Sequence, residues 1–171
     1  MTYRHIDGVE VTAQFSDDRK FRYRLDISMP NFSPAHETAC VVMQNPSYAS
    51  ERVADKSVQF MEKNVFLRGL PEFAAVRRLV VVNQFARIQT NHFQGMSHEI
   101  GSQNDSVIKA VLKESDIIII GWGCANRFEK RKNFFLACLR KLKNKRLFQT
   151  RKHPSRGCYK DFIQPFNLVA P

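Results

Sequence analysis

The spacing of apolar residues changes along the chain and predicts two kinds of strand. Near the N-terminus, residues 9–15 and 21–27 alternate apolar with polar side chains, which is typical of strands with one face in water. Asp17-Asp18 lies between the two stretches and favours a turn. We therefore predict a β-hairpin within residues 1–30.

Further along, the apolar runs are short and continuous. They cover residues 40–43, 79–82, 116–120 and, more weakly, 147–150. Runs of this kind suit strands that are buried on both faces, as in a parallel sheet. Between them, residues 51–64, 104–114 and 127–143 have the apolar spacing of amphipathic helices.

Strands that alternate with helices in this way indicate an α/β fold. We expect a single domain over residues 1–171, with three layers and a central, mostly parallel sheet of about four strands. The hairpin of residues 1–30 precedes this sheet as an N-terminal extension.

The net charge changes the picture because it is concentrated in one segment. Residues 127–156 hold twelve basic side chains and one acidic one, whereas the rest of the chain has fifteen of each. A strong field of one sign attracts polyanions, of which nucleic acid is the commonest. We predict that this segment faces nucleic acid; a merely solvated basic helix is the alternative.

Several other classes of protein are disfavoured. The purely apolar runs, among them residues 117–120, are far shorter than the roughly 20 residues of a membrane helix, and the N-terminus has no apolar signal-peptide core. We expect a cytoplasmic protein that does not associate with a membrane. We also expect that it needs no cofactor and no obligate protein partner. No metal site is predicted, because the histidines are scattered and no Cys-x-x-Cys pair exists among Cys40, Cys124, Cys138 and Cys158.

Polar, loop-forming residues follow each predicted buried strand. They are Asn45-Pro46-Ser47, Asn83, Gly121-Trp122-Gly123 and His153-Pro154-Ser155. In open α/β sheets the ligand crevice lies outside the carboxyl ends of the strands. Asn45, Asn83 and His153 are therefore expected to be neighbours on one rim, despite their separation in sequence.

Taken in order, these motifs carry two resemblances. Over roughly residues 20–165 the chain resembles a domain family of bacteria and phages whose activity is not known. The shared pattern is Asn45-Pro46-Ser47, Asp55, Val82-Asn83, Gly101-Ser102-Gln103-Asn104-Asp105, Trp122-Gly123 and His153-Pro154. The same landmarks are similar to those of the uracil-DNA glycosylase superfamily, in which a His-Pro-Ser loop precedes a basic, aromatic segment.

The second resemblance implies an enzyme that cleaves the bond between a flipped base and its sugar. Asn45 would position the attacking water, and Asn83 would read the Watson–Crick edge of the base. Phe60 would stack on that base. His153 would donate a hydrogen bond to a base oxygen as negative charge develops there.

Further residues receive supporting roles from the same resemblance. Asp55 and Trp122 would support the site, and the DNA, double-stranded in this reading, would be held by Arg151, Lys152, Ser155, Arg156 and Tyr159. Either Arg156 or Tyr159 would act as the wedge that fills the gap left by the flipped base. No lysine matches a Schiff-base position, which favours a monofunctional DNA glycosylase over a lyase.

One departure from the uracil enzymes concerns the base itself. Those enzymes have a tyrosine after the Asp-Pro that blocks substituents at C5 of the pyrimidine, and this chain has the smaller Ser47. The pocket would then accept a C5-modified pyrimidine, such as a modified cytosine of phage DNA, and the protein would serve antiviral defence. A bulky Tyr48 turned into the pocket would count against this hypothesis.

Each motif also has a plainer interpretation. Asn45-Pro46-Ser47 could be an ordinary turn, Asn83 a strand-end cap, Asp55 a helix cap, and Phe60 part of the core. At the level of function, the alternatives are a nucleotide N-glycosidase and a nucleic-acid-binding module that has kept the fold and lost the chemistry.

Overall fold

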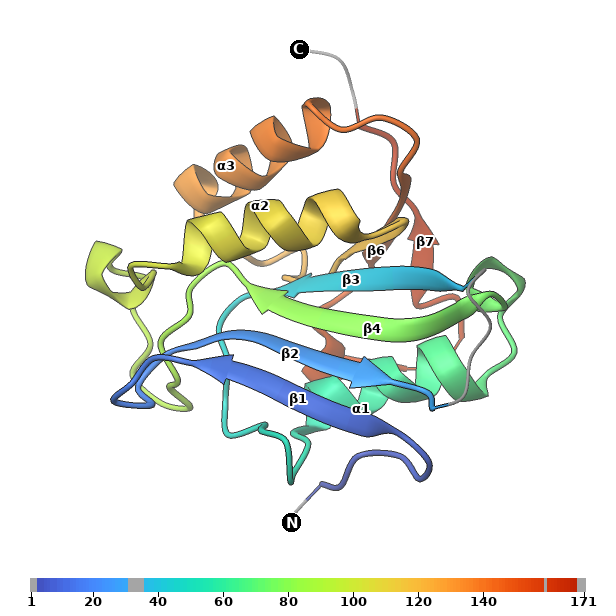
Figure 1. Cartoon of the computed structure of the whole chain (residues 1–171). Coiled ribbons are helices and arrows are strands. Elements are labelled where there is room, and N and C mark those ends of the chain that lie inside the picture. The colour runs from blue at the N-terminus through green and yellow to red at the C-terminus, as the bar shows by residue number, and fades with distance from the viewer. Residues whose placement is uncertain (1–2, 31–35, 159, 169–171) are drawn as a thin grey trace.

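A computed structural model describes residues 3–30, 36–158 and 160–168. Within them, seven strands form one sheet in the order β1-β2-β4-β3-β5-β6-β7 (Figure 1). The strands are β1 (Glu10–Phe15), β2 (Arg22–Ser28), β3 (Glu37–Met43), β4 (Val76–Asn83), β5 (Ile117–Ile120), β6 (Arg146–Thr150) and β7 (Ile163–Pro165).

The sheet is mixed. Its centre, β4-β3-β5-β6, is parallel, whereas β1-β2, β2-β4 and β6-β7 are antiparallel. The expected fold class, a mostly parallel sheet of about four strands like that of a uracil-DNA glycosylase with a separate hairpin before it, is therefore wrong. The α/β class remains.

The hairpin belongs to the sheet for a physical reason. The alternation in β2 buries Leu25 and Ile27 completely, and both residues pair in register with β4. A strand with unpaired backbone groups and a fully buried apolar face gains more from joining an existing sheet edge than from standing apart. The alternation in the sequence predicts the strand but does not name the strand with which it pairs.

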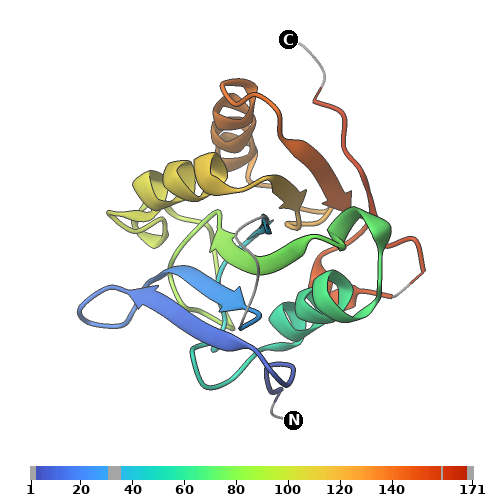
Figure 2. The ribbon, with the colours of Figure 1, turned by 45° about the vertical axis from the view of Figure 1, so that its right-hand side comes forward.

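In the described part of the chain, three α-helices cover the sheet on both faces (Figures 1 and 2). They are α1 (Lys56–Glu62), which continues as a π-helix over Lys63–Leu67, α2 (Asn104–Glu114) and α3 (Glu129–Arg140). Short 3-10 helices lie at Pro71–Phe73, Ser97–Glu99 and Pro154–Arg156. The helix predicted over residues 104–114 is confirmed with the same bounds, and the other two are shorter than predicted.

Two apolar cores separate the helices from the sheet. Val41, Leu79 and Ile117 point toward α1, whereas their strand neighbours Val42 and Ile118 point toward α2 and α3. Successive residues of a strand face opposite sides, so a strand with helices on both sides must be apolar throughout. This explains the continuous runs in the sequence, and it leaves the polar chemistry to the ends of the strands. Among the described residues, no helix has the length and apolar character to cross a membrane.

Candidate active site

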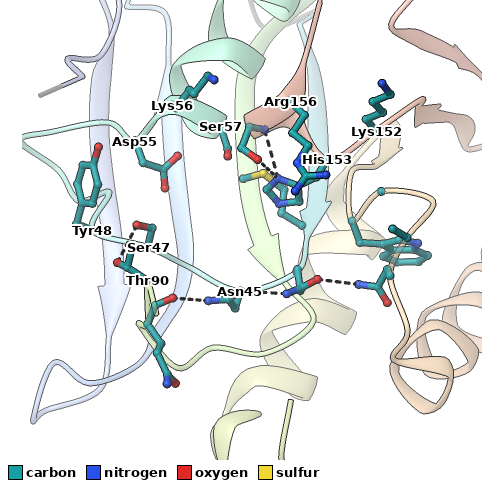
Figure 3. A pocket seen from close by; sticks show the side chains of 18 of the residues that line it. Asn45, Ser47, Tyr48, Asp55, Lys56, Ser57, Thr90, Lys152, His153 and Arg156 are labelled. Carbon is teal, nitrogen blue, oxygen red and sulfur yellow. Dashed lines mark hydrogen bonds between the residues drawn. The ribbon is translucent and has the colours of Figure 1, made fainter. Parts of the chain in front are cut away.

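A cavity of about 600 Å³ opens at the carboxyl ends of the parallel strands (Figure 3). Its walls come from the loops that follow β3, β4, β5 and β6 and from the start of α1. This is the edge of the sheet at which the sequence predicts a ligand crevice. Of the predicted site residues, the cavity brings together Asn45, Ser47, Asp55, Trp122, Lys152, His153, Ser155 and Arg156.

His153 follows β6 and begins the 3-10 helix Pro154–Arg156. Its Nδ1 accepts a hydrogen bond from the backbone N–H of Ser155 at 3.2 Å, and the Ser155 hydroxyl lies 2.9 Å from the same nitrogen. A nitrogen that accepts from a backbone N–H carries no proton, so the proton of the neutral ring is on Nε2. Among the described residues no acceptor contacts Nε2, and its N–H is available to a ligand in the cavity.

The ring is held in this neutral form. Burial lowers the pKa of His153 below its ordinary value of 6.5, the charge of Asp55 opposes this effect, and the charge of Arg156 adds to it. The imidazole is therefore neutral at pH 7. It is a hydrogen-bond donor that brings no positive charge of its own into the cavity.

Asn45 lies on the loop that leaves β3. Its Nδ2 donates to the backbone carbonyl of Gln89 at 2.7 Å and to that of Pro46 at 3.3 Å. The backbone N–H of Gln89 in turn donates to the carbonyl of Pro46 at 3.0 Å. Oδ1 of Asn45 accepts from Nε2 of Gln44 at 3.5 Å. These bonds fix the amide, and the second acceptor site of Oδ1 can orient a bound molecule.

The floor of the cavity contains a buried cation. Arg22 from β2 is 1% exposed, and its guanidinium donates to the carbonyl of Ala49 at 2.8 Å and to Oδ1 of Asn83 at 3.2 Å. Burial lowers the pKa of Arg22 to about 10, and the charge of Asp55 opposes the shift. Arg22 is therefore still a cation at neutral pH.

Asn83 and Phe60 do not line the cavity. Asn83 is buried beneath the floor. Its Oδ1 accepts a hydrogen bond from Arg22, and its Nδ2 has no hydrogen-bond partner among the described residues. Phe60 packs edge to face on Phe162 with ring centroids 4.9 Å apart, and Gly157 closes over it so tightly that a Cβ there would lie 2.3 Å from the ring. The predicted roles in reading and stacking on a base are not supported by these positions, because neither side chain reaches the cavity.

Three exposed cations surround the mouth of the cavity, namely Lys56, Lys152 and Arg156. Of the other residues assigned to DNA binding, Arg151 lines a smaller adjoining cavity beside Trp122, and Tyr159 lies outside the described residues. Trp122 lines both cavities and packs on Phe135 at 5.6 Å between ring centroids, so it forms a wall of the site.

The basic segment 127–156 does not form one surface. β6 divides it, because Arg146 begins that strand and pairs with Glu37 at the start of β3, the end of the sheet remote from the cavity. Lys145 donates to the carbonyls of Lys113 and Ser115 at the same end. Within the segment, the residues that line the cavity are Lys152, His153, Ser155 and Arg156, all of which follow β6.

Tyr48 stands beside Ser47 in the wall of the cavity and is 45% exposed at its mouth (Figure 3). The wall therefore carries a bulky aromatic ring next to the small serine. Because this ring is exposed at the mouth, the room that Ser47 would leave for a substituent at C5 stays a prediction. Ser47 itself is held by a hydroxyl contact of 3.3 Å to Thr90.

Sequence patterns missed several lining residues. Arg22 reads as one of the polar positions of an alternating strand, and Tyr48 and Gln89 have no motif of their own. Asn126 also lines the cavity, where it donates to Gln84 at 2.7 Å and thereby fixes the loop after β5. Within the described part of the chain, no three His, Cys, Asp or Glu side chains gather as a metal site would require.

Gly123 supports His153 through close contact. It has a φ of +81°, and a Cβ at this position would lie 2.7 Å from the backbone nitrogen of His153. We expect Gly123→Ala to lower the free energy of unfolding by about 2 kcal/mol, measured by urea denaturation, since left-handed backbone costs an L-residue about 1–2 kcal/mol before any clash. It should also shift the NMR signals of the His153 ring.

Gly8 provides the matched control, because it has a φ of +79° and open space around its Cβ position. Gly8→Ala should show the backbone cost alone and leave the His153 signals in place. Equal losses in both variants, with no change at His153, would show that the contact does not position the ring.

Comparisons with known proteins give a family but no activity. A family model described as "Protein of unknown function (DUF1643)" matches residues 22–156, which include every residue named above as lining the cavity. No curated protein and no solved structure matches the chain.

Proposed function

The chain belongs to the DUF1643 family, and we propose from its cavity that it is a DNA glycosylase. It hydrolyses the N-glycosidic bond of a flipped nucleotide and leaves an abasic site. The observation that carries the proposal is the neutral His153, whose Nε2–H has no partner among the described residues and lies in a cavity with a cationic mouth.

The role of His153 follows from the charge that the reaction creates. When the bond between C1′ and the base breaks, negative charge develops on the base and positive charge on the sugar. A fixed N–H donor at a base oxygen stabilises that charge most where water is excluded. An imidazolium would also donate, but it would lose the hydrogen bond from Ser155 that orients the ring.

The cations at the mouth suit the phosphates on either side of the flipped nucleotide. Lys56, Lys152 and Arg156 are exposed around the opening, so they contact phosphates without the cost of burial. A base inside a duplex cannot reach such a cavity, and the nucleotide must be extruded. Tyr48 at the mouth takes the stacking role that Phe60, in the core, cannot fill.

A salt titration tests the phosphate contacts. We expect Lys152→Ala and Arg156→Ala each to weaken binding of an oligonucleotide and to reduce the salt slope of the binding constant by about 1, the effect of one lost phosphate contact. Fluorescence anisotropy at several salt concentrations measures both quantities. Lys143→Ala, an exposed lysine before β6 at the remote end of the sheet, is the control and should leave the slope unchanged.

A nucleotide N-glycosidase is the second candidate, and two observations favour it. The cavity of about 600 Å³ is large for a base alone. In addition, the only residues of the basic segment that line the cavity are the few that follow β6. If this candidate is correct, free nucleotides will be cleaved at least as fast as oligonucleotides, and the salt slope will be small.

One experiment separates the candidates. The purified protein is incubated with oligonucleotides that carry uracil, thymine mismatches, 5-hydroxymethylcytosine or glucosylated cytosine, and separately with the free nucleotides. Alkali reveals abasic sites, and chromatography detects released base. Release from an oligonucleotide that is lost in Asn45→Ala and His153→Ala supports the glycosylase. Salt-sensitive binding without release from any substrate would instead favour a non-catalytic binding module.

A further inference from the structure

Asp55 supplies the single carboxylate among the described residues that line the cavity. It is the N-cap of α1, where its Oδ1 accepts a hydrogen bond from the backbone N–H of Val58 at 2.9 Å. The residue is only 8% exposed, and Figure 3 shows its carboxylate turned toward the cavity. The cap fixes one oxygen and leaves the other facing the space where a ligand would bind.

That second oxygen, Oδ2, has no donor among the described residues. Burial of an incompletely bonded carboxylate costs free energy, and the buried guanidinium of Arg22 offsets part of this cost because each charge favours the other. The charge of Asp55 also acts on His153 and on Tyr48. The carboxylate is therefore within electrostatic reach of the floor, the N–H donor and the aromatic ring at the mouth.

Hydrolysis needs a group that takes a proton from water, and the other polar groups of the cavity do not fit this need. The neutral amide of Asn45 can orient a water through Oδ1 but does not take its proton. Nδ1 of His153 is occupied by Ser155, and Nε2 already carries a proton. Lys56, Lys152 and Arg156 are cations, as is Arg22. The carboxylate of Asp55 is the acceptor that remains.

On the basis of the N-glycosidase activity proposed above, we propose that Asp55 is the general base of this site. The bond between C1′ and the base nitrogen breaks, and its electron pair leaves with the base toward the N–H of His153. The oxygen of a water that Asn45 orients forms the new bond to C1′. One proton of that water moves to Oδ2 of Asp55 and then passes to the departed base, which restores the carboxylate.

Asp55→Asn separates this role from helix capping, because asparagine caps a helix as well as aspartate does. We expect kcat for base release to fall by about 10²–10⁴-fold, the usual contribution of a general base, with unchanged affinity for the same oligonucleotide. The pH–rate profile adds a readout that a structural role would not change. If a general base acts in the wild type, the acid limb of its pH–rate profile should include one proton that the Asp55→Asn profile lacks.

The groups that face Asp55 stay the same in both proteins. They are Arg22 from β2, Tyr48 from the loop after β3, and His153 and Arg156 from the loop after β6. A change in the acid limb is therefore attributable to Asp55. Asp55→Ser, which also retains a capping side chain, provides a second variant if the asparagine variant does not fold.

The outcomes distinguish this inference from the function on which it rests. Strong loss of kcat and of one proton from the acid limb supports the general base. A wild type that releases base beside a folded, equally active Asp55→Asn variant overturns the role of Asp55 and leaves the glycosylase intact. A wild type that releases base from neither oligonucleotides nor nucleotides overturns both proposals.

Discussion

Replacement of His153 by alanine is expected to lower kcat/KM for base release by about 10²–10³-fold, the usual effect of removing one donor to a developing anion. The reason is geometric. Ser155 holds the ring through Nδ1, so Nε2–H is directed at the cavity before substrate arrives and no reorganisation is needed during bond cleavage. The measurement is single-turnover release of base from the best substrate of the panel.

Two further variants separate the donor from the structural role of His153, which also caps the 3-10 helix Pro154–Arg156. His153→Asn keeps an acceptor near the position of Nδ1 and should retain the cap without restoring activity. His153→Gln places an amide N–H near the position of Nε2 and should recover part of the rate. His98→Ala, at an exposed histidine away from the cavity, is the control. Equal rates in the Asn and Gln variants would contradict the donor role.

The architecture could be predicted from the sequence wherever the hydrophobic effect acts on a regular period. Val41 and Val42 lie on a strand with helices on both faces, so both must be apolar and the run is visible. The order in which strands pair is harder to predict, because strands pair through backbone hydrogen bonds, which do not depend on a particular side chain. Nothing in Leu25 or Ile27 indicates that β2 pairs with β4, and β7, three residues long, has too few positions to show a period.

The sequence was enough to predict which loops form the candidate site. It was not enough to predict how deeply each side chain is buried there. Asn45 and His153 follow strands of a parallel sheet, and topology alone brings them to one cavity. The depth of a side chain beneath that edge depends on tertiary packing. Asn83 also ends a strand, yet it is buried under Arg22, and Gly157 keeps Phe60 in the core. The mixed sheet also brings Arg22 from the hairpin to the cavity floor, which no local motif indicates.

A second large effect is expected on stability at Glu62, a fully buried residue of α1. Its carboxylate accepts from Nδ1 of His5 at 2.5 Å and from the backbone N–H of Ile6 at 3.0 Å. His5 Nε2 in turn lies 2.8 Å from the carbonyl of Ser50, on the loop that carries Tyr48 and leads to the cavity. The pair therefore connects the N-terminal segment, α1 and one wall of the candidate active site.

We expect Glu62→Gln to lower the free energy of unfolding by about 3 kcal/mol, since loss of one partner of a buried ion pair leaves the other uncompensated. Urea denaturation measures this change. Glu51→Gln, which removes a largely exposed ion pair with Arg19, is the control and should cost well under about 1 kcal/mol. Similar losses in the two variants would contradict a special role for the buried pair.

The pH dependence of stability tests the same pair independently. Burial alone would lower the pKa of His5, but the hydrogen bonds to Glu62 and Ser50 and the charge of Glu62 outweigh it and raise the pKa above 6.5. The stabilisation is therefore complete below pH 6.5 and is lost as the pH rises through the raised pKa of the folded state. His153, whose pKa is lowered, affects stability only below pH 6.5. Between pH 6.5 and the raised pKa of His5, wild-type stability should decline as the pH rises. Glu62→Gln should remove most of the decline in this range. Without the carboxylate, the folded protein no longer holds the His5 proton more tightly than the unfolded chain does.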